Sequence, residues 1–253
     1  MHTEIGIAIG SQFCLVDLAL YLPGQRTLAI ADLHLGFEDA LQQEGVLLPR
    51  QHLARIYQRL QKIFQTLEIT PARPLKQLIV NGDLRHQFGP LSRQESKESF
   101  ALLQWLVERA QRLTLIKGNH DGDLSQLAHR FASVEIKQSY QEQNCFFVHG
   151  DQIPDEIPNE IRWIVIGHEH PAISLRDSVT NRFETYKCFL IGMYEDKKLL
   201  VQPSFNLLVA GADLTKEAVL SPFIRESCLK DFSVYLVADD GSLYDFGPLR
   251  RLL

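Results

Sequence analysis

Five short motifs rich in histidine and aspartate lie between residues 32 and 170, and their side chains are of types that bind divalent metal ions. In chain order the motifs are Asp32-Leu-His34, Gly82-Asp83, Gly118-Asn119-His120-Asp121, His149-Gly-Asp151 and Gly167-His168-Glu-His170. Imidazole nitrogens with carboxylate and amide oxygens suit Mn, Fe, Zn and related cations, and none of these motifs contains a cysteine. Five of the nine histidines belong to the motifs, so they concentrate the metal-binding chemistry of the chain.

Each motif also has an ordinary structural explanation when it is taken alone. An Asp-x-His pair is often a turn aspartate beside a surface histidine, and Gly-Asp after a strand is usually a turn. The specific pattern is the occurrence of all five in this order. We interpret His2, His52 and His129 as structural, because they lie at the terminus or within helical patterns outside the motifs.

A buried strand is predicted immediately before each motif. The predicted strands are the short apolar runs 27–30, 78–80, 113–116, 145–148 and 163–166. Open α/β sheets place their sites beyond the carboxyl ends of the strands, so the five motifs converge if these strands are neighbours. Gly82, Gly118 and Gly167 fit this arrangement, because glycine permits tight turns and close backbone approach.

Helical periodicity between these runs predicts an α/β fold in a single domain, residues 1–253. Apolar stripes indicate helices over 53–67, opened by Pro49, over 100–110 and over 124–131. In the last third, the segments 186–194, 198–201, 206–210 and 233–238 are predicted to be strands of a second sheet packed on the first.

Composition narrows the class of protein. The chain has 253 residues with a net charge of −5, which weighs mildly against tight nonspecific binding to DNA. Its four cysteines form no C-x-x-C pair, which disfavours a disulfide scaffold and is typical of a reducing cytosol. No signal peptide or membrane-spanning run is visible, so we expect a cytoplasmic protein that does not enter a membrane.

The motif order resembles the calcineurin-like metallophosphoesterase family over about residues 28–172. This resemblance implies a four-layer αββα sandwich of two mixed sheets. A closer resemblance, to prokaryotic predicted phosphoesterases related to the nuclease subunits of DNA-repair complexes, rests on four segments: Asp32-Leu-His34-Leu-Gly36, Gly82-Asp83-Leu-Arg-His86, Gly167-His-Glu-His-Pro171 and Gly241-Ser-Leu-Tyr-Asp-Phe-Gly247. Some of these relatives are associated with a DNA ligase and a helicase, although the chain lacks the long DNA-facing domain of the larger repair nucleases.

The family resemblance implies two adjacent divalent metal ions, with manganese as the first choice and Fe, Zn, Mg or Ni as alternatives. The implied ligands are Asp32, His34 and His170 for one ion, Asn119, His149 and His168 for the other, and Asp83 as a bridge between them. The resemblance also implies that His120 contacts the phosphoryl group or protonates the leaving alkoxide, that Asp121 orients its ring, and that His86 positions the substrate.

Two cations with two carboxylates leave a positively charged site that attracts phosphate and generates a metal-bound hydroxide near neutral pH. We therefore predict a two-metal phosphoesterase, first of all a phosphodiesterase or nuclease acting on DNA or RNA. The alternatives are a phosphodiesterase or phosphatase acting on small nucleotides or phosphoproteins, and a non-catalytic scaffold on the same fold.

Other charged residues near the motifs have both functional and structural interpretations. Arg85 is either a phosphate clamp or a solvated loop residue, and Asp151 and Glu169 either support metal ligands or face solvent. A nucleic-acid path or an exposed strand face would explain Arg176, Arg182 and Lys187. Residues 213–232 have no functional interpretation from sequence.

Overall fold

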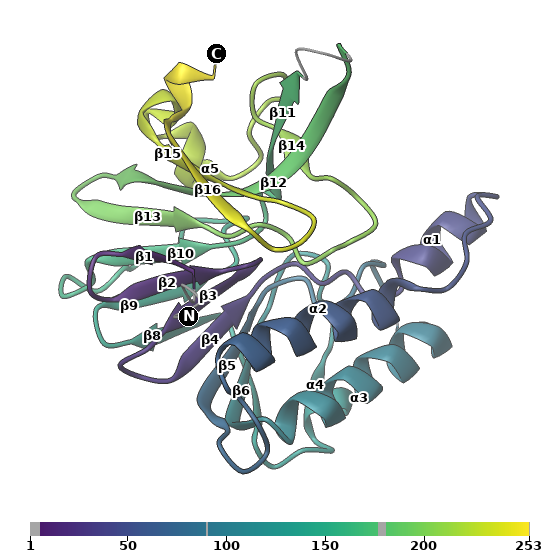
Figure 1. Cartoon of the computed structure of the whole chain (residues 1–253). Helices are drawn as coiled ribbons and strands as arrows, with labels where there is room; N and C mark the ends of the chain where they lie inside the picture. Colours follow the sequence, from purple (N-terminus) through teal and green to yellow (C-terminus); the bar gives the residue numbers. More distant parts are fainter. Residues whose placement is uncertain (1–5, 90, 177–180, 253) are drawn as a thin grey trace.

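Two mixed β-sheets packed face to face form the centre of the protein, seen in a computed structural model that describes residues 6–89, 91–176 and 181–252 (Figure 1). The seven-stranded sheet follows chain order: β1 (Ile7–Ile9), β2 (Phe13–Val16), β3 (Ala19–Leu22), β4 (Thr27–Ile30), β5 (Leu75–Asn81), β6 (Ala110–Ile116) and β7 (Val134–Lys137). Strands β4 to β7 are parallel, and β1 to β4 pair antiparallel.

The nine-stranded sheet is built from the later part of the chain. Its main path is β14 (Ala212–Asp213), β11 (Pro171–Arg176), β12 (Phe183–Tyr194), β13 (Lys197–Val201), β10 (Trp163–Ile166), β9 (Cys145–Val148) and β8 (Ser139–Glu142). β15 (Ser233–Val237) pairs with the long strand β12, and β16 (Leu243–Pro248) pairs with β15. Within this sheet β10 is parallel to both β9 and β13.

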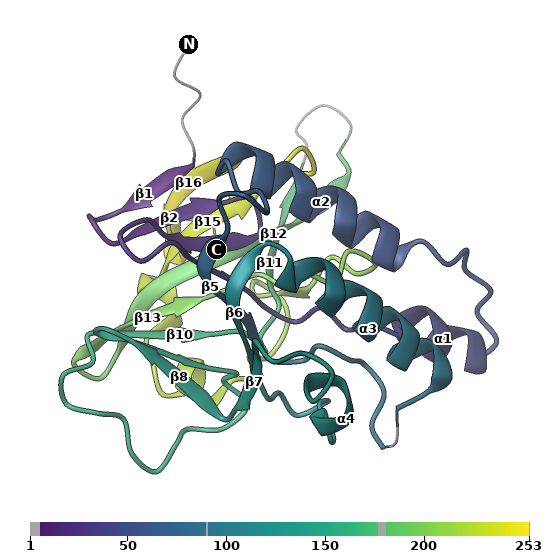
Figure 2. The same cartoon turned by 90° about the horizontal axis from the view of Figure 1, so that it is seen from below.

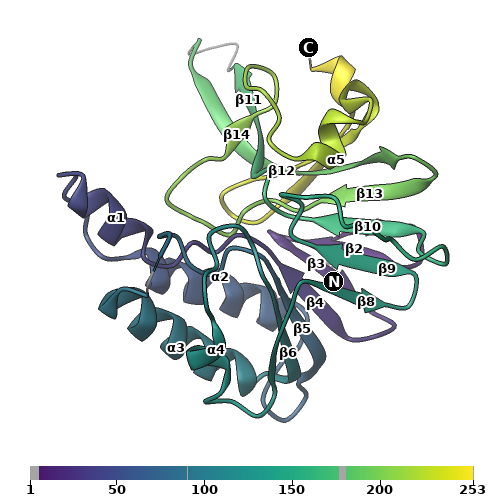
Figure 3. The same ribbon diagram turned by 180° about the vertical axis from the view of Figure 1, so that it is seen from behind.

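Helices cover the outer faces of the two sheets, as Figures 1 and 2 show. The seven-stranded sheet carries α2 (His52–Thr66), α3 (Arg93–Val107) and α4 (Ser125–Ala128), and α1 (Phe37–Gln43) extends from it. The nine-stranded sheet carries the short α5 (Pro222–Arg225) with the 3-10 turns η1 (Leu229–Asp231) and η2 (Leu249–Arg251), visible from behind in Figure 3. The predicted four-layer αββα architecture is confirmed, with a thin outer layer on the second sheet.

All five apolar runs that precede the motifs are strands, and they divide between the two sheets. The runs at 27–30, 78–80 and 113–116 lie in β4, β5 and β6, where Ile30 pairs with Val80 and Val80 with Leu115. The runs at 145–148 and 163–166 are β9 and β10. Because each group is parallel and in register, its motifs leave the sheet at one edge.

A buried polar network joins the two sheets at that edge. The Asn81 side chain donates to the Val165 carbonyl at 3.2 Å and to the Gln202 side chain at 3.3 Å. Gln202 donates in turn to the Ala29 carbonyl at 3.1 Å. Buried hydrogen bonds of this kind favour a single arrangement, so they hold the strand ends of one sheet opposite those of the other.

The predicted start of the first long helix was wrong, because α2 begins at His52 and not near Pro49. The Glu38 carboxylate, from α1, accepts hydrogen bonds from the backbone N–H groups of Gln51 at 2.6 Å and His52 at 2.9 Å. These are N–H groups that the first turn of a helix leaves without partners. A distant carboxylate therefore sets where the helix begins.

The predicted strand over 206–210 was also wrong. Asn206 accepts a hydrogen bond from the Leu208 backbone N–H at 3.1 Å, which closes a turn in place of a strand. The other segments predicted for the second sheet, 186–194, 198–201 and 233–238, correspond to β12, β13 and β15.

Two general predictions concern cysteines and membranes. Cys14, Cys145, Cys188 and Cys228 are all free thiols, as their scattered positions indicated. Among the described residues, no helix combines the length and the apolar character needed to cross a bilayer.

Candidate metal centre

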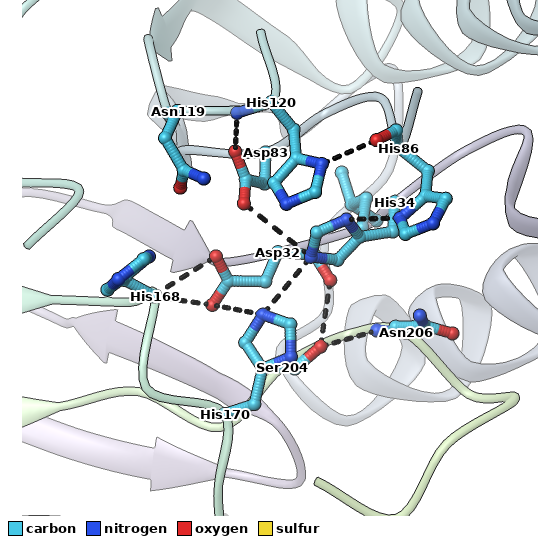
Figure 4. Close-up of polar contacts among 12 residues, drawn as sticks. Asp32, His34, Asp83, His86, Asn119, His120, His168, His170, Ser204 and Asn206 are labelled. Carbon is cyan, nitrogen blue, oxygen red and sulfur yellow. Dashed lines mark hydrogen bonds and ion pairs between the residues drawn. The ribbon is translucent and has the colours of Figure 1, made fainter. Parts of the chain in front are cut away.

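The loops after β4 and β5 continue side by side beyond the sheet and bring the first two motifs together. His34 donates its backbone N–H to the Asp83 carbonyl at 2.9 Å, and Leu35 donates to the Leu84 carbonyl at 2.9 Å. A parallel bridge between Leu35 and Arg85 extends this pairing. The side chains of Asp32, His34 and Asp83 consequently point into one space, which Figure 4 shows.

The backbone at this site is strained at five positions. Asp32, His34, Asp83, His168 and His170 have φ angles of 55°, 47°, 45°, 64° and 49°. Residues with a Cβ adopt this left-handed region infrequently, at about 1–3 kcal/mol each, and such residues cluster at functional sites. Five such residues from three motifs indicate that the fold positions these side chains against the local preference of the backbone.

The first donor group consists of Asp32, His34, Asp83 and His170, whose ligand atoms all lie within 4.8 Å of one another. The Nε2 atoms of His34 and His170 are 3.1 Å apart. His34 Nε2 lies 3.6 Å from an Asp83 oxygen, and His170 Nε2 lies 3.7 Å from an Asp32 oxygen. Two imidazoles and two carboxylates thus converge on a single point between the sheets.

The second donor group consists of Asp83, His149 and His168 and meets the same distance limit. His149 Nε2 is 3.4 Å from an Asp83 oxygen and 3.2 Å from His168 Nδ1. The Asn119 side-chain oxygen lies 3.0 Å from the same His149 nitrogen. Asp83 belongs to both donor groups, so its carboxylate could contact a cation held by either of them.

The two central carboxylates titrate in opposite directions. Burial and the neighbouring charges of Asp32 and Asp121 raise the pKa of Asp83 to about 9. Burial alone would raise the pKa of Asp32 as well, but the facing rings of His170, His149 and His34 outweigh it and lower the value to about 2. Like charges at close range disfavour double ionisation, so positive charge bound beside the two groups would favour the ionised form of both.

Burial disfavours the protonated form of two of these histidines, His34 and His168. Burial, followed by the charge of His170, lowers the pKa of His34 well below its ordinary value. Burial and the neighbouring His149 lower the pKa of His168 to about 4. A histidine must be unprotonated to bind a metal, so the donor set fits two divalent cations with nitrogen and oxygen ligands.

Two glycines are required by the close approach of ligands. A Cβ on Gly82, whose φ is +86°, would lie 1.9 Å from His149 Nδ1. A Cβ on Gly118 would lie 2.1 Å from an Asp83 oxygen. Both distances are far below van der Waals contact, so these glycines provide the space in which His149 and Asp83 sit.

His120 lies beside the donor groups, with its ring fixed by the backbone of the neighbouring loop. Its backbone N–H donates to Asp83 at 2.9 Å, and its Nδ1–H donates to the His86 carbonyl at 2.5 Å. The ring hydrogen is therefore on Nδ1 in the neutral form, which leaves Nε2 as an acceptor. Burial lowers the pKa of His120.

The expectation that Asp121 orients the His120 ring is not met. The Asp121 carboxylate accepts hydrogen bonds from the backbone N–H groups of Gly118 at 3.0 Å, Arg85 at 3.2 Å and Leu84 at 3.3 Å. It therefore ties the loops of the second and third motifs together, and the His86 carbonyl holds the imidazole.

His86 faces the site as the sequence predicted, with its Nδ1 3.2 Å from His34 Nδ1. Burial and the nearby His120 lower the pKa of His86 to about 4. His34, His86 and His120 form a third cluster of donor atoms, which overlaps the first group through His34. The rings of His86 and His120 are partly exposed, so this side of the site is open to solvent.

Arg85 is not placed to clamp a phosphate. Its side chain is buried and donates to the carbonyls of Gly89 at 2.8 Å and Gln87 at 2.6 Å, and it lies 3.4 Å from the Glu95 carboxylate. These contacts show that the arginine supports the loop after the second motif.

The segment 213–232 binds the side chain of Glu169. The Glu169 carboxylate is fully buried and accepts from the backbone N–H groups of Leu220 at 2.9 Å and Ser221 at 2.8 Å. The Ser221 hydroxyl donates to the Gly150 carbonyl at 2.7 Å. The segment therefore holds the loop of His168 and His170, which the sequence alone did not indicate.

The predicted basic path from Arg176 to Lys187 is not continuous. Arg176 and Arg182 are exposed, but the Nζ atom of Lys187 is buried and has no hydrogen-bond partner within the described residues. Burial lowers the pKa of Lys187 to about 7, although the charge of Asp32 opposes this. The Lys187 amine is therefore not part of an exposed basic path.

Ser204 and Asn206 were missed by sequence reasoning. The Ser204 hydroxyl donates to the Asp32 carbonyl at 2.9 Å, and the Asn206 backbone N–H donates to that hydroxyl at 3.0 Å (Figure 4). The only sequence indication was their position directly after the 198–201 strand, the same position that the five motifs occupy.

A cavity of about 520 Å³ lies next to Asn119 and His149. Asp151 and Asp155 line it together with polar residues that include Ser139 and Gln152. Asp151 therefore faces this cavity, and is not itself a member of either donor group. The cavity is large enough for part of a small organic phosphate.

Comparison with known proteins finds a matching family and similar folds. Residues 25–211 match the family profile described as calcineurin-like phosphoesterase. The fold is similar to that of Pseudomonas putida nuclease MPE, with 20% identity, a TM-score of 0.60, and coverage of 95% of this chain and 98% of that one. YfcE, a phosphoesterase from E. coli, aligns with 13% identity over 88% of this chain and 98% of its own, at a TM-score of 0.43. No curated protein sequence matches the chain.

Proposed function

The chain belongs to the calcineurin-like phosphoesterase family, and on this basis we propose that it is a two-metal phosphodiesterase that cleaves strands of DNA or RNA. That it is a metal-dependent phosphoesterase, a hydrolase of phosphate ester bonds, follows from its family. The proposal adds the ligand set, manganese as the metal, and the nature of the ester.

The observation that carries the proposal is the shared position of Asp83. Its carboxylate belongs to the group with Asp32, His34 and His170 and also to the group with His149 and His168. With Asn119 beside His149, the chain has seven nitrogen and oxygen donors for two cations. Two divalent cations held there would supply positive charge for a phosphate and lower the pKa of a water molecule.

The other site residues have roles that their geometry allows. His120 lies next to Asp83 with its ring fixed by the His86 carbonyl, so its Nε2 atom is available to a phosphoryl or leaving-group oxygen. Transfer of a proton to a leaving alkoxide needs the protonated ring, and the negative charge of a bound phosphate ester favours that form. His86 lies on the same open side and would contact the substrate strand.

Two observations bear on the choice between a polymer and a small ester. The similar structure from Pseudomonas putida is a nuclease, and the partly exposed His86 and His120 leave one side of the site open. The cavity beside Asn119, lined by Asp151 and Asp155, instead favours a small nucleotide over a polyanion. A phosphodiesterase acting on small nucleotides is therefore the second candidate.

One set of assays separates these candidates. Purified protein with Mn²⁺ is offered single-stranded DNA, single-stranded RNA, bis(p-nitrophenyl) phosphate and p-nitrophenyl phosphate. We expect hydrolysis of the small diester and of at least one polymer, with little hydrolysis of the monoester, and loss of activity in Asp83→Asn. Rapid hydrolysis of the small substrates with both polymers intact would favour the second candidate and refute the nuclease.

A further inference from the structure

Phe88 is an exposed aromatic residue at the edge of the candidate metal centre. Its side chain is 70% exposed. Its ring stacks on that of His120, with centroids 4.2 Å apart and planes inclined by 29°. An isolated exposed phenylalanine needs no explanation, but this one contacts a residue that lies against the central carboxylate, and two further features set it apart.

The first feature is the support of its backbone. The buried Arg85 side chain donates to the carbonyl of Gln87, which precedes Phe88, at 2.6 Å, and to that of Gly89, which follows it, at 2.8 Å. The buried Glu95 carboxylate accepts from the Gln87 backbone N–H at 2.9 Å. Burial of a charged pair is unfavourable unless both partners are well bonded. The Arg85–Glu95 pair therefore holds the backbone on both sides of Phe88, whose own side chain remains exposed to solvent.

The second feature is the arrangement of rings next to Phe88. The His120 ring is also stacked with that of His86, at 5.3 Å and an angle of 16°. The Phe37 ring meets His86 edge-on at 4.6 Å. A continuous series of aromatic rings thus leads from the donor groups to the exposed face of Phe88. Because the loop is already held in place, binding of a partner to that face would cost little further conformational entropy.

We propose that Phe88, with His120, forms a stacking subsite for a nucleobase of the substrate next to the phosphodiester that is cleaved; this rests on the proposed nuclease function. A fixed, exposed ring favours planar partners, and bases stack on aromatic side chains with little dependence on their identity. The subsite selects substrates that carry a base beside the scissile bond and discriminates weakly between bases.

The test compares two trinucleotides that differ only in their bases. One is thymidine trinucleotide, and the other has the same phosphodiester backbone with abasic sugars. Cleavage with Mn²⁺ is followed by chromatography for the wild type, Phe88→Ala, Phe88→Trp and Phe183→Ala. Phe183 is a matched control, because it is 62% exposed and lies at the start of β12, outside the donor groups.

We expect the wild type to prefer the base-bearing trinucleotide by about 10-fold or more in kcat/KM. Phe88→Ala should lower kcat/KM for this substrate by about 10- to 100-fold and leave the abasic one within about 2-fold, so that the preference disappears. Phe88→Trp and Phe183→Ala should keep the preference.

Three outcomes would overturn the subsite. If Phe88→Ala slows both trinucleotides equally, Phe88 only covers His120. Equal wild-type cleavage of the two would show that no base is recognised, while the nuclease function stands. If the wild type hydrolyses bis(p-nitrophenyl) phosphate but neither trinucleotide, the nuclease function fails together with the subsite.

Discussion

Gly118→Ala should remove most activity although it replaces no proposed metal ligand. The new Cβ would lie 2.1 Å from an Asp83 oxygen, 2.5 Å from the Asp83 nitrogen and 2.8 Å from its carboxyl carbon. To restore an ordinary contact of 3.4 Å the oxygen must retreat by about 1.3 Å. A displacement of about 1 Å at a reacting centre lowers rates about 100-fold, so we expect a loss of about 100-fold or more in kcat.

The assay is hydrolysis of bis(p-nitrophenyl) phosphate with Mn²⁺, together with metal content by elemental analysis and a thermal unfolding curve. Gly24→Ala is the matched control, because a Cβ there meets nothing within 4 Å. We expect the control to behave as the wild type. If folded Gly118→Ala retains full activity and metal content, Asp83 does not occupy the bridging position, and the assignment of the centre is wrong.

Three further predictions concern single side chains. His120→Gln should lower kcat by about 100-fold or more with metal content unchanged, because only the proton-transferring ring is lost; unchanged turnover would exclude that role. Metal binding to metal-free protein at pH 7 should release protons, since Asp83 has a pKa raised to about 9, and a pH indicator should record less release for Asp83→Asn. Lys187 has a folded-state pKa lowered to about 7 from 10.5, so the unfolded state binds more protons between these values and stability rises with pH there. Urea unfolding at pH 7 and pH 9 measures this effect. Between these pH values the free energy of unfolding of the wild type should rise by about 2 kcal/mol more than that of Lys187→Met. An equal change in the two proteins would contradict the burial of the amine.

The strands that carry the site could be predicted from sequence, because each is a short apolar run that ends at a chemically distinctive motif. Burial on both faces makes such runs nearly continuous in hydrophobic residues, and the polar residues that follow mark the edge of the sheet. This reasoning placed β4, β5, β6, β9 and β10 correctly. It also brought together residues that are far apart in the chain, since parallel strands end at one edge.

The parts that could not be predicted depend on partners distant in the chain. The start of α2 is set by Glu38, whose carboxylate binds the N–H groups of Gln51 and His52. Glu169 is bound by the backbone at Leu220 and Ser221, about fifty residues away. Neither contact can be read from the local sequence, in which Pro49 is the only signal for the start of the helix.

Side-chain roles near the motifs were harder to predict than their positions. Asp121 adjoins His120 in sequence, yet its carboxylate binds three backbone N–H groups in two loops, and the His86 carbonyl holds the ring. Arg85 is charged and follows the second motif, yet it is buried against carbonyl groups. Adjacent residues in a loop point in different directions, so their partners depend on a backbone path that composition does not determine.

The most direct test of the two-metal centre is a crystal structure of the protein grown with Mn²⁺, with anomalous diffraction to locate the ions. Two anomalous peaks are expected about 3.5–4 Å apart, one on each side of the Asp83 carboxylate. One peak should lie beside His34 and His170, and the other beside His149 and His168. A single ion that Asp83 does not contact, or ions bound elsewhere on the molecule, would contradict a two-metal centre at Asp83.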